Sequence, residues 1–403
     1  MATMASEQAM HSAGGSEWTR SSAMIIMLCF VLNMVDGMDV LVVSYVAPAL
    51  QMAWQIGPGE FAFVFSAGLA GMAIGGIGLA PLADRFGRRR MIVLALTVMT
   101  LAMLASSTAK SVGELAAYRI VVGTGIGTVL ACIAAVAARV APAKHRNFAV
   151  GVLQAGYPIG AMLSGFATAW ALPHYGWQAV MIATAAISAI CIPFVLAILP
   201  ARLATNSVGQ HVQLKQIIAQ DRRWSSLLLW TSVICGFMAL YFITSWITKL
   251  AIEAGLPETQ AIIASAIYNF GAFSGTFAMS VAGTRVDVRK ISSLLLIATA
   301  AIFLFFGGVS LPLAGVLVTA FIMGACLQGG FNALYPIAAQ VYPDHIRATG
   351  IGWAMGIGRI GAFSGPLIGG WALAKDLPLV AVFAIFCVPL LIAAVAVRRI
   401  RFA

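Results

Sequence analysis

Long apolar segments, separated by short polar breaks, follow one another along almost the whole chain. Twelve of them are each long enough to cross the hydrocarbon core of a bilayer, about 30 Å thick, as an α-helix. The pattern therefore predicts an all-α membrane protein with twelve transmembrane helices. The predicted spans are residues 22–50, 60–82, 91–109, 114–138, 147–171, 179–199, 225–248, 258–282, 291–309, 313–338, 348–373 and 379–397.

The longest polar segment inside the chain divides these spans into two groups of six. A Val-x-Pro-x-x-x-Arg pattern ending at Arg146, before the fifth span, recurs 201 residues later and ends at Arg347, before the eleventh. An internal repeat of six-helix halves is typical of secondary transporters. The predicted organisation is an N-terminal tail 1–21, a first half 22–199, a central loop 200–224, a second half 225–397 and a C-terminal tail 398–403.

Positive charge gathers on one side of the predicted membrane. If the N-terminus is cytoplasmic, 19 of the 24 Lys and Arg residues fall in cytoplasmic segments and three fall outside, while Arg119 and Arg359 lie within spans. By the positive-inside rule, both termini are then cytoplasmic, and we expect a multi-pass protein of the bacterial inner membrane. The same distribution explains the net charge of +11 without a nucleic-acid partner.

Composition agrees with this interpretation and excludes several classes of protein. Charged residues make up 9% of the chain, against about 25% in a soluble domain. The six cysteines lie inside apolar spans without Cys-x-x-Cys spacing, which disfavours zinc and disulfides. No span contains histidine and no phosphate-binding loop is present, so we expect no enzyme, no metal and no cofactor. A sensor would need an output domain larger than the central loop.

Two carboxylates near the middle of the first span are the most unusual feature of the sequence. Asp36 and Asp39 each cost about 2.5–3.5 kcal/mol at the centre of an inserting helix, and their spacing places them on one face. Such residues are functional candidates by default, and we expect them to carry a coupling proton. The alternative is a buried ion pair that only fixes helix packing.

Two arginines within spans are the candidates for holding an anionic substrate. Arg119 begins the stretch RIVVGTGIG in the fourth span, and its guanidinium matches the geometry of a carboxylate. The alternatives for Arg119 are a permanent ion pair with Asp36 or Asp39, or a side chain that reaches the membrane interface. Arg359 in the eleventh span binds either substrate or neighbouring backbone carbonyls.

The loop GLAPLADRFGRRR at residues 78–90 resembles the signature loop of the major facilitator superfamily, and the stretch after Arg119 resembles the fourth-helix pattern of that family. The resemblance implies a fold of twelve helices in two six-helix halves. It also implies that Asp84 contacts the N-terminus of a neighbouring helix and biases the outward-open state. We expect a gating role for this loop and its counterpart in the second half, through the residues Asp84, Arg85, Gly87, Arg88 and Asp287.

A narrower resemblance rests on the sequence Asp36-Gly37-Met38-Asp39, which matches the Asp-Gly-x-Asp hallmark of the aromatic acid:proton symporters. The segments YFITSW at 241–246 and YPDHIRATGIGWAMGIGRIGAFSGP at 342–366 are also similar to that family. Departures are Arg139, Gln178 and Thr248, where the family usually has Glu, Arg and Pro, and these leave the substrate open. The resemblance implies import of a benzoate- or hydroxybenzoate-like carboxylate with a proton, and we expect a monomer in the lipid bilayer.

Further polar residues within the spans are candidates for contacts with the substrate. Gln328 and Asn332 share one face of the tenth span at a spacing of four, which suits hydrogen bonds to a ring substituent. For each candidate, a hydrogen bond between helices is the competing explanation. The expected substrate-binding residues are Arg119, Gln154, Tyr241, Trp246, Asn269, Gln328, Asn332 and Arg359.

The expected mechanism is a competition for charge. Burial disfavours the ionised form of a carboxyl group, and a nearby arginine favours it. If a substrate carboxylate takes Arg119, then Asp36 or Asp39 loses its partner and accepts a proton more readily, so substrate and proton load together. The alternatives are a transporter of a non-aromatic organic acid, such as a muconate-like dicarboxylate held by Arg119 and Arg359, or an exporter.

Overall fold

A computed structural model describes residues 18–142, 146–200, 218–220, 222–283, 285–343 and 346–402 of the chain, and these residues are almost entirely helical. Helices are expected because lipid offers no hydrogen-bond partner, so each spanning segment must satisfy its own backbone groups. The first group of elements comprises α2 (Arg20–Trp54), α3 (Pro58–Ile74), the π-helical turn η1 (Gly75–Leu79), the 3-10 turn η2 (Ala80–Leu82), α4 (Ala83–Phe86), α5 (Arg88–Ser106), α6 (Val112–Val140) and α7 (Arg146–Ile198).

The second group follows the central polar segment. Its helices α12 and α13 meet at Ala333 and together correspond to a single predicted span. The elements are α9 (Arg223–Glu253), α10 (Glu258–Ala282), α11 (Val288–Gly308), α12 (Leu313–Asn332), α13 (Leu334–Val341), α14 (Arg347–Ala374) and α15 (Leu379–Arg399).

About ten to eleven of the described helices are long and apolar enough to span a membrane. Ten pass on length and composition, and one of these is the 48-residue stretch Gly151–Ile198. The backbone of this stretch bends at Gly176, where φ is +77°, so two predicted spans form one bent element. A residue other than glycine would be strained at this φ.

Local signals set the ends of the helices that carry the candidate residues. Thr19 caps α2 through its side chain, which accepts a hydrogen bond from the Ser22 backbone N–H, and Gln55 ends the helix in the left-handed region. The first helix therefore extends several residues beyond the predicted span 22–50. Gly87 separates α4 from α5 with φ +90°, which is the tight turn expected in that loop.

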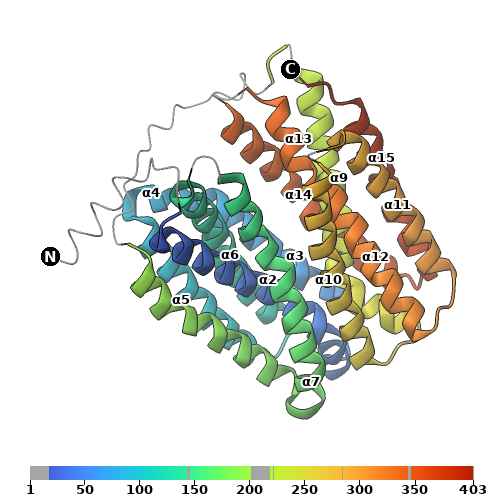
Figure 1. Ribbon diagram of the computed structural model, residues 1–403. Coiled ribbons are helices and arrows are strands. Elements are labelled where there is room, and N and C mark those ends of the chain that lie inside the picture. The colour runs from blue at the N-terminus through green and yellow to red at the C-terminus, as the bar shows by residue number, and fades with distance from the viewer. Residues whose placement is uncertain are drawn as a thin grey trace.

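The helices pack as two groups of neighbours that meet along a common interface. In the first group α2 packs on α7 and α3 packs on α6, while in the second group α9 packs on α14, α10 on α12 and α11 on α15. Figure 1 shows α4 and α13 at one end of the bundle and the tip of α7 at the other. Contacts between the groups run from α3 to α14, from α7 to α10 and from α2 to α9.

The contacts between the groups lie toward the end of the bundle remote from α4. The Ser44 hydroxyl donates to the Ser245 carbonyl at 2.8 Å, and the Ser66 hydroxyl donates to the Phe363 carbonyl at 3.0 Å. Ser66 belongs to the first half of α3, whose other end leads to α4. Two hydroxyls thus cross the interface and hold the groups together at this end.

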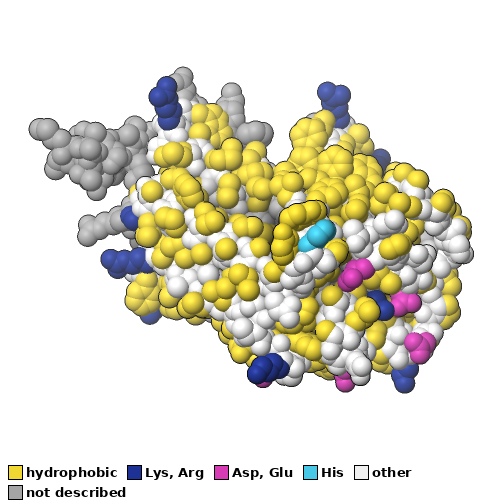
Figure 2. All heavy atoms as spheres, turned by 90° about the horizontal axis from the view of Figure 1, so that it is seen from below, with side chains coloured by type: hydrophobic (Ala, Val, Ile, Leu, Met, Phe, Trp, Pro, Cys, Tyr) yellow, Lys and Arg dark blue, Asp and Glu magenta, His cyan; other side chains and the backbone are white. Residues whose placement is uncertain are grey.

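The outer surface of the bundle is strongly apolar. Figure 2 looks at the end that lies at the bottom of Figure 1 and shows mainly hydrophobic side chains, with scattered acidic and basic ones. Large apolar residues such as Phe63, Phe277 and Leu294 expose more than 60% of their surface. A soluble monomer rarely exposes such continuous apolar area, and lipid is the surrounding that covers it.

Candidate functional site

The two acidic residues of α2 lie deep inside the first group of helices. Asp36 is 0% exposed and Asp39 is 1% exposed. Gly37 between them lies against the backbone carbonyl of Tyr157 in α7, where a Cβ atom would collide. The glycine therefore allows the α2 and α7 backbones to touch and encloses the carboxylates between the two helices.

Arg119 on α6 reaches the same buried region. Its guanidinium Nη2 donates to the backbone carbonyl of Asp39 at 2.9 Å and lies close enough to the Asp39 side chain to interact with it electrostatically. Among the described residues, Arg119 forms no ion pair with a carboxylate. The guanidinium thus lies beside Asp39 with further N–H groups left to donate.

Gly68 on α3 lies beside the same guanidinium, since a Cβ atom there would be 3.7 Å from Nε and Nη2 of Arg119. Gly123, one helical turn after Arg119, lies against the backbone carbonyl of Gly68. This close approach of α3 and α6 brings Arg119 to the boundary between the two groups of helices.

Ser188 on the second part of α7 joins this region and was not found by sequence reasoning. Its hydroxyl lies 3.4 Å from Oδ2 of Asp39, and it also donates to the Thr184 carbonyl at 3.2 Å. Within the described part of the chain, both carboxylate oxygens of Asp36 and Oδ1 of Asp39 lack a hydrogen-bond partner. A single serine in an apolar span carries no signal that distinguishes it from a helix-packing residue.

A cleft opens beside Arg119, between the first group of helices and α9. One wall is made by α2, α3 and α6 and the other by Tyr241 and Ser245 of α9. Binding sites for small organic molecules are typically apolar with a few polar groups that orient the ligand, and this cleft has that character. Its lining residues are Val40, Val43, Val64, Phe65, Gly68, Leu69, Met72, Arg119, Ile126, Tyr241 and Ser245.

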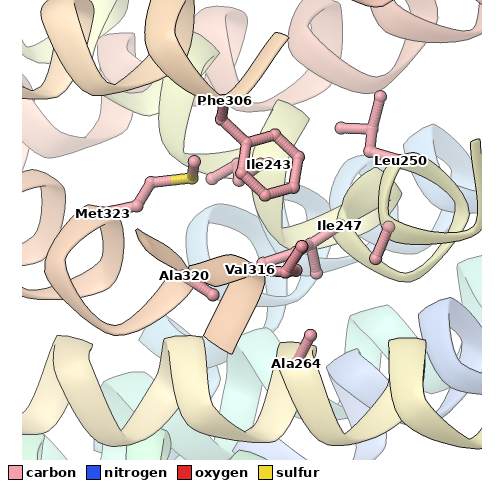
Figure 3. Close-up of a pocket in the computed structure, with 9 residues that line it drawn as sticks. Ile243, Ile247, Leu250, Ala264, Phe306, Val316, Ala320 and Met323 are labelled. Carbon is pink, nitrogen blue, oxygen red and sulfur yellow. The ribbon is translucent and has the colours of Figure 1, made fainter. Parts of the chain in front are cut away.

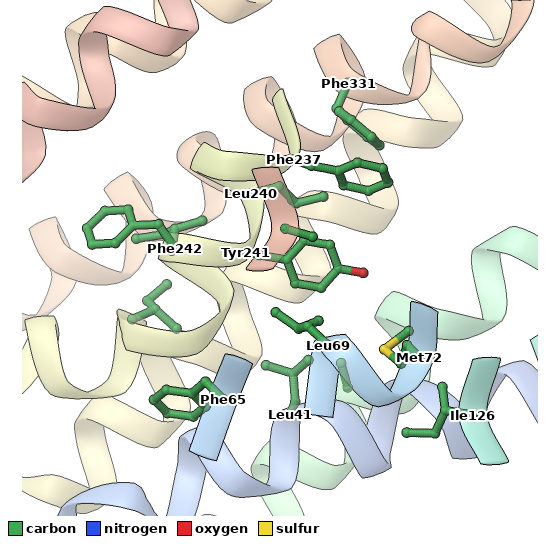
Figure 4. Close-up of a cluster of buried hydrophobic side chains, with 14 of the residues drawn as sticks. Leu41, Phe65, Leu69, Met72, Ile126, Phe237, Leu240, Tyr241, Phe242 and Phe331 are labelled. Carbon is green, nitrogen blue, oxygen red and sulfur yellow. The ribbon is translucent and has the colours of Figure 1, made fainter. Parts of the chain in front are cut away.

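A second arginine lies behind Tyr241. Arg359 on α14 donates from Nη1 to the Tyr241 hydroxyl at 3.3 Å, and its guanidinium lies 5.7 Å from the ring centre of Phe237. Phe237 in turn contacts Tyr241 and Phe331, with ring centres 5.5 Å and 4.5 Å away. Figure 4 shows the Tyr241 hydroxyl pointing away from α9 into the space between Phe237 and Met72.

Four other predicted site residues are committed to bonds within the helix bundle. Gln328 Nε2 lies 3.4 Å from Oδ1 of Asn332, and Asn332 Nδ2 donates to the Thr276 hydroxyl at 2.8 Å. Asn269 donates to the Ser265 carbonyl one turn earlier in its own helix, at 2.9 Å. These amides therefore already have partners in α10 and α12.

Trp246 and Gln154 lie in opposite surroundings. Trp246 is completely buried, donates from its ring N–H to the Pro366 carbonyl at 3.0 Å and packs edge-on against Phe65. Gln154 is exposed on α7. The structure therefore places Trp246 in the packing between α9 and α14, and neither residue is among those that line the cleft.

The residues expected to act in gating lie around the α4 turn and at the start of α11. Arg85 is exposed, Arg88 begins α5 directly after Gly87, and the side chain of Asp84 lies outside the described residues. Asp287 caps α11 and forms hydrogen bonds of 2.9–3.1 Å with the side chain of Arg289. These bonds lower the pKa of Asp287 below its ordinary value.

Arg289 also connects the start of α11 to the end of the described chain. Its Nη1 donates to the Ile400 carbonyl at 2.7 Å, and its guanidinium lies 4.3 Å from the ring centre of Phe402. The Asp287–Arg289 pair therefore has a clear packing role on this side of the bundle.

A second cavity, inside the second group of helices, has a different character. Figure 3 shows it among α9, α10, α11 and α12, with only carbon and sulfur side-chain atoms around it. It offers no polar group to orient a carboxylate. The lining residues are Ile243, Ile247, Leu250, Ala251, Ala264, Phe306, Val316, Ala320 and Met323.

Comparison with known proteins gives consistent results over nearly the whole chain. Residues 29–306 and 229–402 match the family model described as the Major Facilitator Superfamily. The chain is 30% identical to a gallate transporter of Pseudomonas putida over 93% of its own length and 90% of that protein. It is 29% identical to a 4-hydroxybenzoate transporter of Pseudomonas aeruginosa, over 86% and 85% of the two chains.

A third relative and one solved structure extend this result. The chain is 30% identical to the 3-(3-hydroxy-phenyl)propionate transporter of Escherichia coli, over 92% of each chain. The fold matches a bacterial homologue of the human lysosomal transporter Spinster in an inward-facing, occupied conformation, with a TM-score of 0.76, 17% identity and coverage of 94% and 97%. The resemblance to transporters, and not to enzymes, is confirmed.

Proposed function

The chain belongs to the Major Facilitator Superfamily, and we propose that it imports an aromatic carboxylate, of the benzoate or hydroxybenzoate type, together with a proton. The observation that carries the proposal is the apolar cleft in which Arg119 lies beside Asp39. An aromatic ring fits apolar walls and a carboxylate fits a guanidinium. The names of the relatives, which transport gallate, 4-hydroxybenzoate and 3-(3-hydroxy-phenyl)propionate, support the aromatic substrate class.

The coupling step that we propose is a competition for Arg119. An ionised Asp39 is stabilised by the nearby guanidinium, whereas a substrate carboxylate that binds Arg119 takes over that interaction. Asp39 then has only the Ser188 hydroxyl, and a proton replaces the lost partner. Asp36, which is buried without a hydrogen bond in the described structure, is the second proton site, because an unpaired charge is costly there.

We propose that the molecule has twelve transmembrane helices in two halves, residues 22–199 and 225–397, with both termini in the cytoplasm. The bend of α7 at Gly176 divides that element into two spans, and α14 adds a span of 28 residues. In this topology, the bonds of Ser44 and Ser66 between the halves lie near the external side. The described conformation is therefore the inward-facing one.

Alternating access requires these contacts to break and the opposite end to close. We propose that the α4 turn, with Asp84, Arg85, Gly87 and Arg88, and the Asp287 turn of the second half form the cytoplasmic gate. The working unit is a monomer in the bacterial inner membrane, since each half already supplies one wall of the cleft.

The test is uptake of labelled 4-hydroxybenzoate into proteoliposomes under an inward proton gradient, with wild type and Asp39→Asn. Wild type is expected to concentrate the acid and to lose the accumulation when an uncoupler is added. Asp39→Asn is expected to bind the acid without concentrating it. Gradient-driven accumulation by Asp39→Asn would contradict the coupling mechanism, and a wild type that takes up no aromatic acid would contradict the substrate class.

A second candidate is a transporter of a di-acid such as a muconate-like dicarboxylate. The observation in its favour is that Arg359, like Arg119, forms no ion pair with a described carboxylate, so two cations face the interface region. Competition of labelled 4-hydroxybenzoate uptake by aliphatic di-acids and aromatic mono-acids separates the candidates. Stronger competition by the di-acids would favour the second one, and efflux of preloaded acid under the same gradient would identify an exporter.

A further inference from the structure

We infer that the Tyr241 hydroxyl, held by Arg359, recognises an oxygen substituent at the end of the aromatic ring remote from the carboxylate. The site would thereby select ring-hydroxylated aromatic acids over unsubstituted ones. This inference rests on the proposed function and specifies its substrate class. It assigns to Tyr241 a role in specificity that is separate from the coupling role of Arg119.

The first step in the argument is the position of Tyr241 relative to Arg119. Both side chains line the same cleft, but Arg119 comes from α6 in the first half and Tyr241 from α9 in the second. The remaining lining side chains are apolar apart from Ser245. A flat ligand that places its carboxylate on Arg119 therefore meets Tyr241 with its far end.

The second step is the hydrogen bond between Arg359 and Tyr241. Because Nη1 of Arg359 donates to the Tyr241 oxygen, the hydrogen of the phenol remains available for an acceptor on the ligand. No acceptor for this hydrogen is found among the described residues. The phenol thus presents a donor to the cleft, polarised by the cation behind it.

The third step concerns the charge around Arg359. Its described neighbours are the Tyr241 hydroxyl and the Phe237 ring, and neither is an acid. A partly buried cation without an acidic neighbour favours an electron-rich oxygen nearby. A ring hydroxyl supplies that oxygen at a lower desolvation cost than a second carboxylate.

The amides of Gln328 and Asn332 are the obvious competitors for the ring substituent. Gln328 is bonded to Asn332, and Asn332 is bonded to Thr276. A substrate would have to displace these bonds, whereas the Tyr241 hydroxyl needs no displacement. The geometry therefore favours Tyr241.

The experiment measures KM for benzoate and for 4-hydroxybenzoate in proteoliposomes, with wild type, Tyr241→Phe and Tyr175→Phe. Tyr175 lies exposed at the α7 bend, so its variant controls for loss of a phenol elsewhere. Wild type is expected to prefer 4-hydroxybenzoate. Tyr241→Phe is expected to reduce the ratio of the two KM values by about tenfold, the effect of one hydrogen bond, while Tyr175→Phe keeps the wild-type ratio.

Several outcomes would overturn the inference. A wild type without preference, or a Tyr241→Phe variant with an unchanged KM ratio, removes the specificity role while the proposed transport function stands. A ratio that changes for terephthalate, a para di-acid, and not for 4-hydroxybenzoate transfers the pole to a second carboxylate. If wild type concentrates neither aromatic acid, the proposed function itself fails, and the inference fails with it.

Discussion

The two intramembrane arginines lie on opposite sides of the interface between the halves, in very different surroundings. Arg119 is 4% exposed, donates to the Asp39 backbone and has two buried carboxylates in the same cluster of helices. Arg359 is only partly buried and has a tyrosine and a phenylalanine as its described neighbours. The difference indicates a division of labour, in which the first half handles the proton and the second half reads the substrate.

The largest effect expected from this division is a difference in stability between the two arginine variants. Removing one partner of a buried charge pair costs about 3–5 kcal/mol, and Arg119 and Asp39 are such neighbours even without a direct ion pair. We expect Arg119→Gln to lower the free energy of unfolding in detergent by about 3 kcal/mol. Arg359→Gln removes one long hydrogen bond, which is worth about 1 kcal/mol.

The matched control is the double variant Arg119→Gln with Asp39→Asn. Because it removes the charge that Arg119→Gln leaves unpaired, part of the lost stability should return. Equal losses from the two single arginine variants, or no recovery in the double variant, would refute the difference between the two sites.

An intermediate effect is expected from the glycines near the two arginines. Gly123 lies against the Gly68 carbonyl, whereas the space around Gly356 on α14 is open to at least 4 Å. Overpacking costs about 1–3 kcal/mol, so Gly123→Ala should destabilise the protein by about that amount. Gly356→Ala should be neutral or slightly stabilising, because alanine favours a helix. Thermal unfolding in detergent measures both, and a similar loss for the two variants would mean that the backbones around Arg119 are not closely packed.

The smallest effect concerns an arginine whose acidic partner lies outside the membrane-spanning helices. Asp287 has a lowered pKa because Arg289 donates hydrogen bonds to it. Its contribution to stability is therefore complete above its unfolded pKa of about 3.9, and it disappears as the pH falls through the lower folded value. Asp287→Asn should cost less than about 1 kcal/mol at pH 7.

Unfolding of wild type and Asp287→Asn, followed from pH 7 to pH 3, checks this sign. The difference between the two proteins should shrink on acidification, as wild type loses the ion pair that the variant lacks at every pH. A difference that grows toward acidic pH would show that Asp287 is not stabilised in its charged form. Such a result would remove the contrast between an exposed arginine pair and the two arginines inside the membrane.

Much of the fold could be predicted from the sequence because lipid imposes strict requirements on it. A spanning segment must be apolar for about 20 residues, so the spans were visible, as were the intramembrane residues Asp36, Asp39, Arg119 and Arg359. The turn at Gly87 was also predictable from its residue type. The break at Ala333 and the continuation of α7 through Gly176 were not, because apolar composition does not specify how one helix leads into the next.

The candidate site was predicted as a set of residues but not as an arrangement. Ser188 escaped notice because a lone serine in a span is common, and Trp246 was expected at the substrate although its ring N–H binds the Pro366 carbonyl. The cost of inserting a charge into lipid is a property of each residue, so the sequence by itself determined which side chains demand an explanation. Only the tertiary structure decided that Arg119 meets the backbone of Asp39 and that Arg359 meets Tyr241 across 118 residues, because such contacts depend on which helix faces pack together.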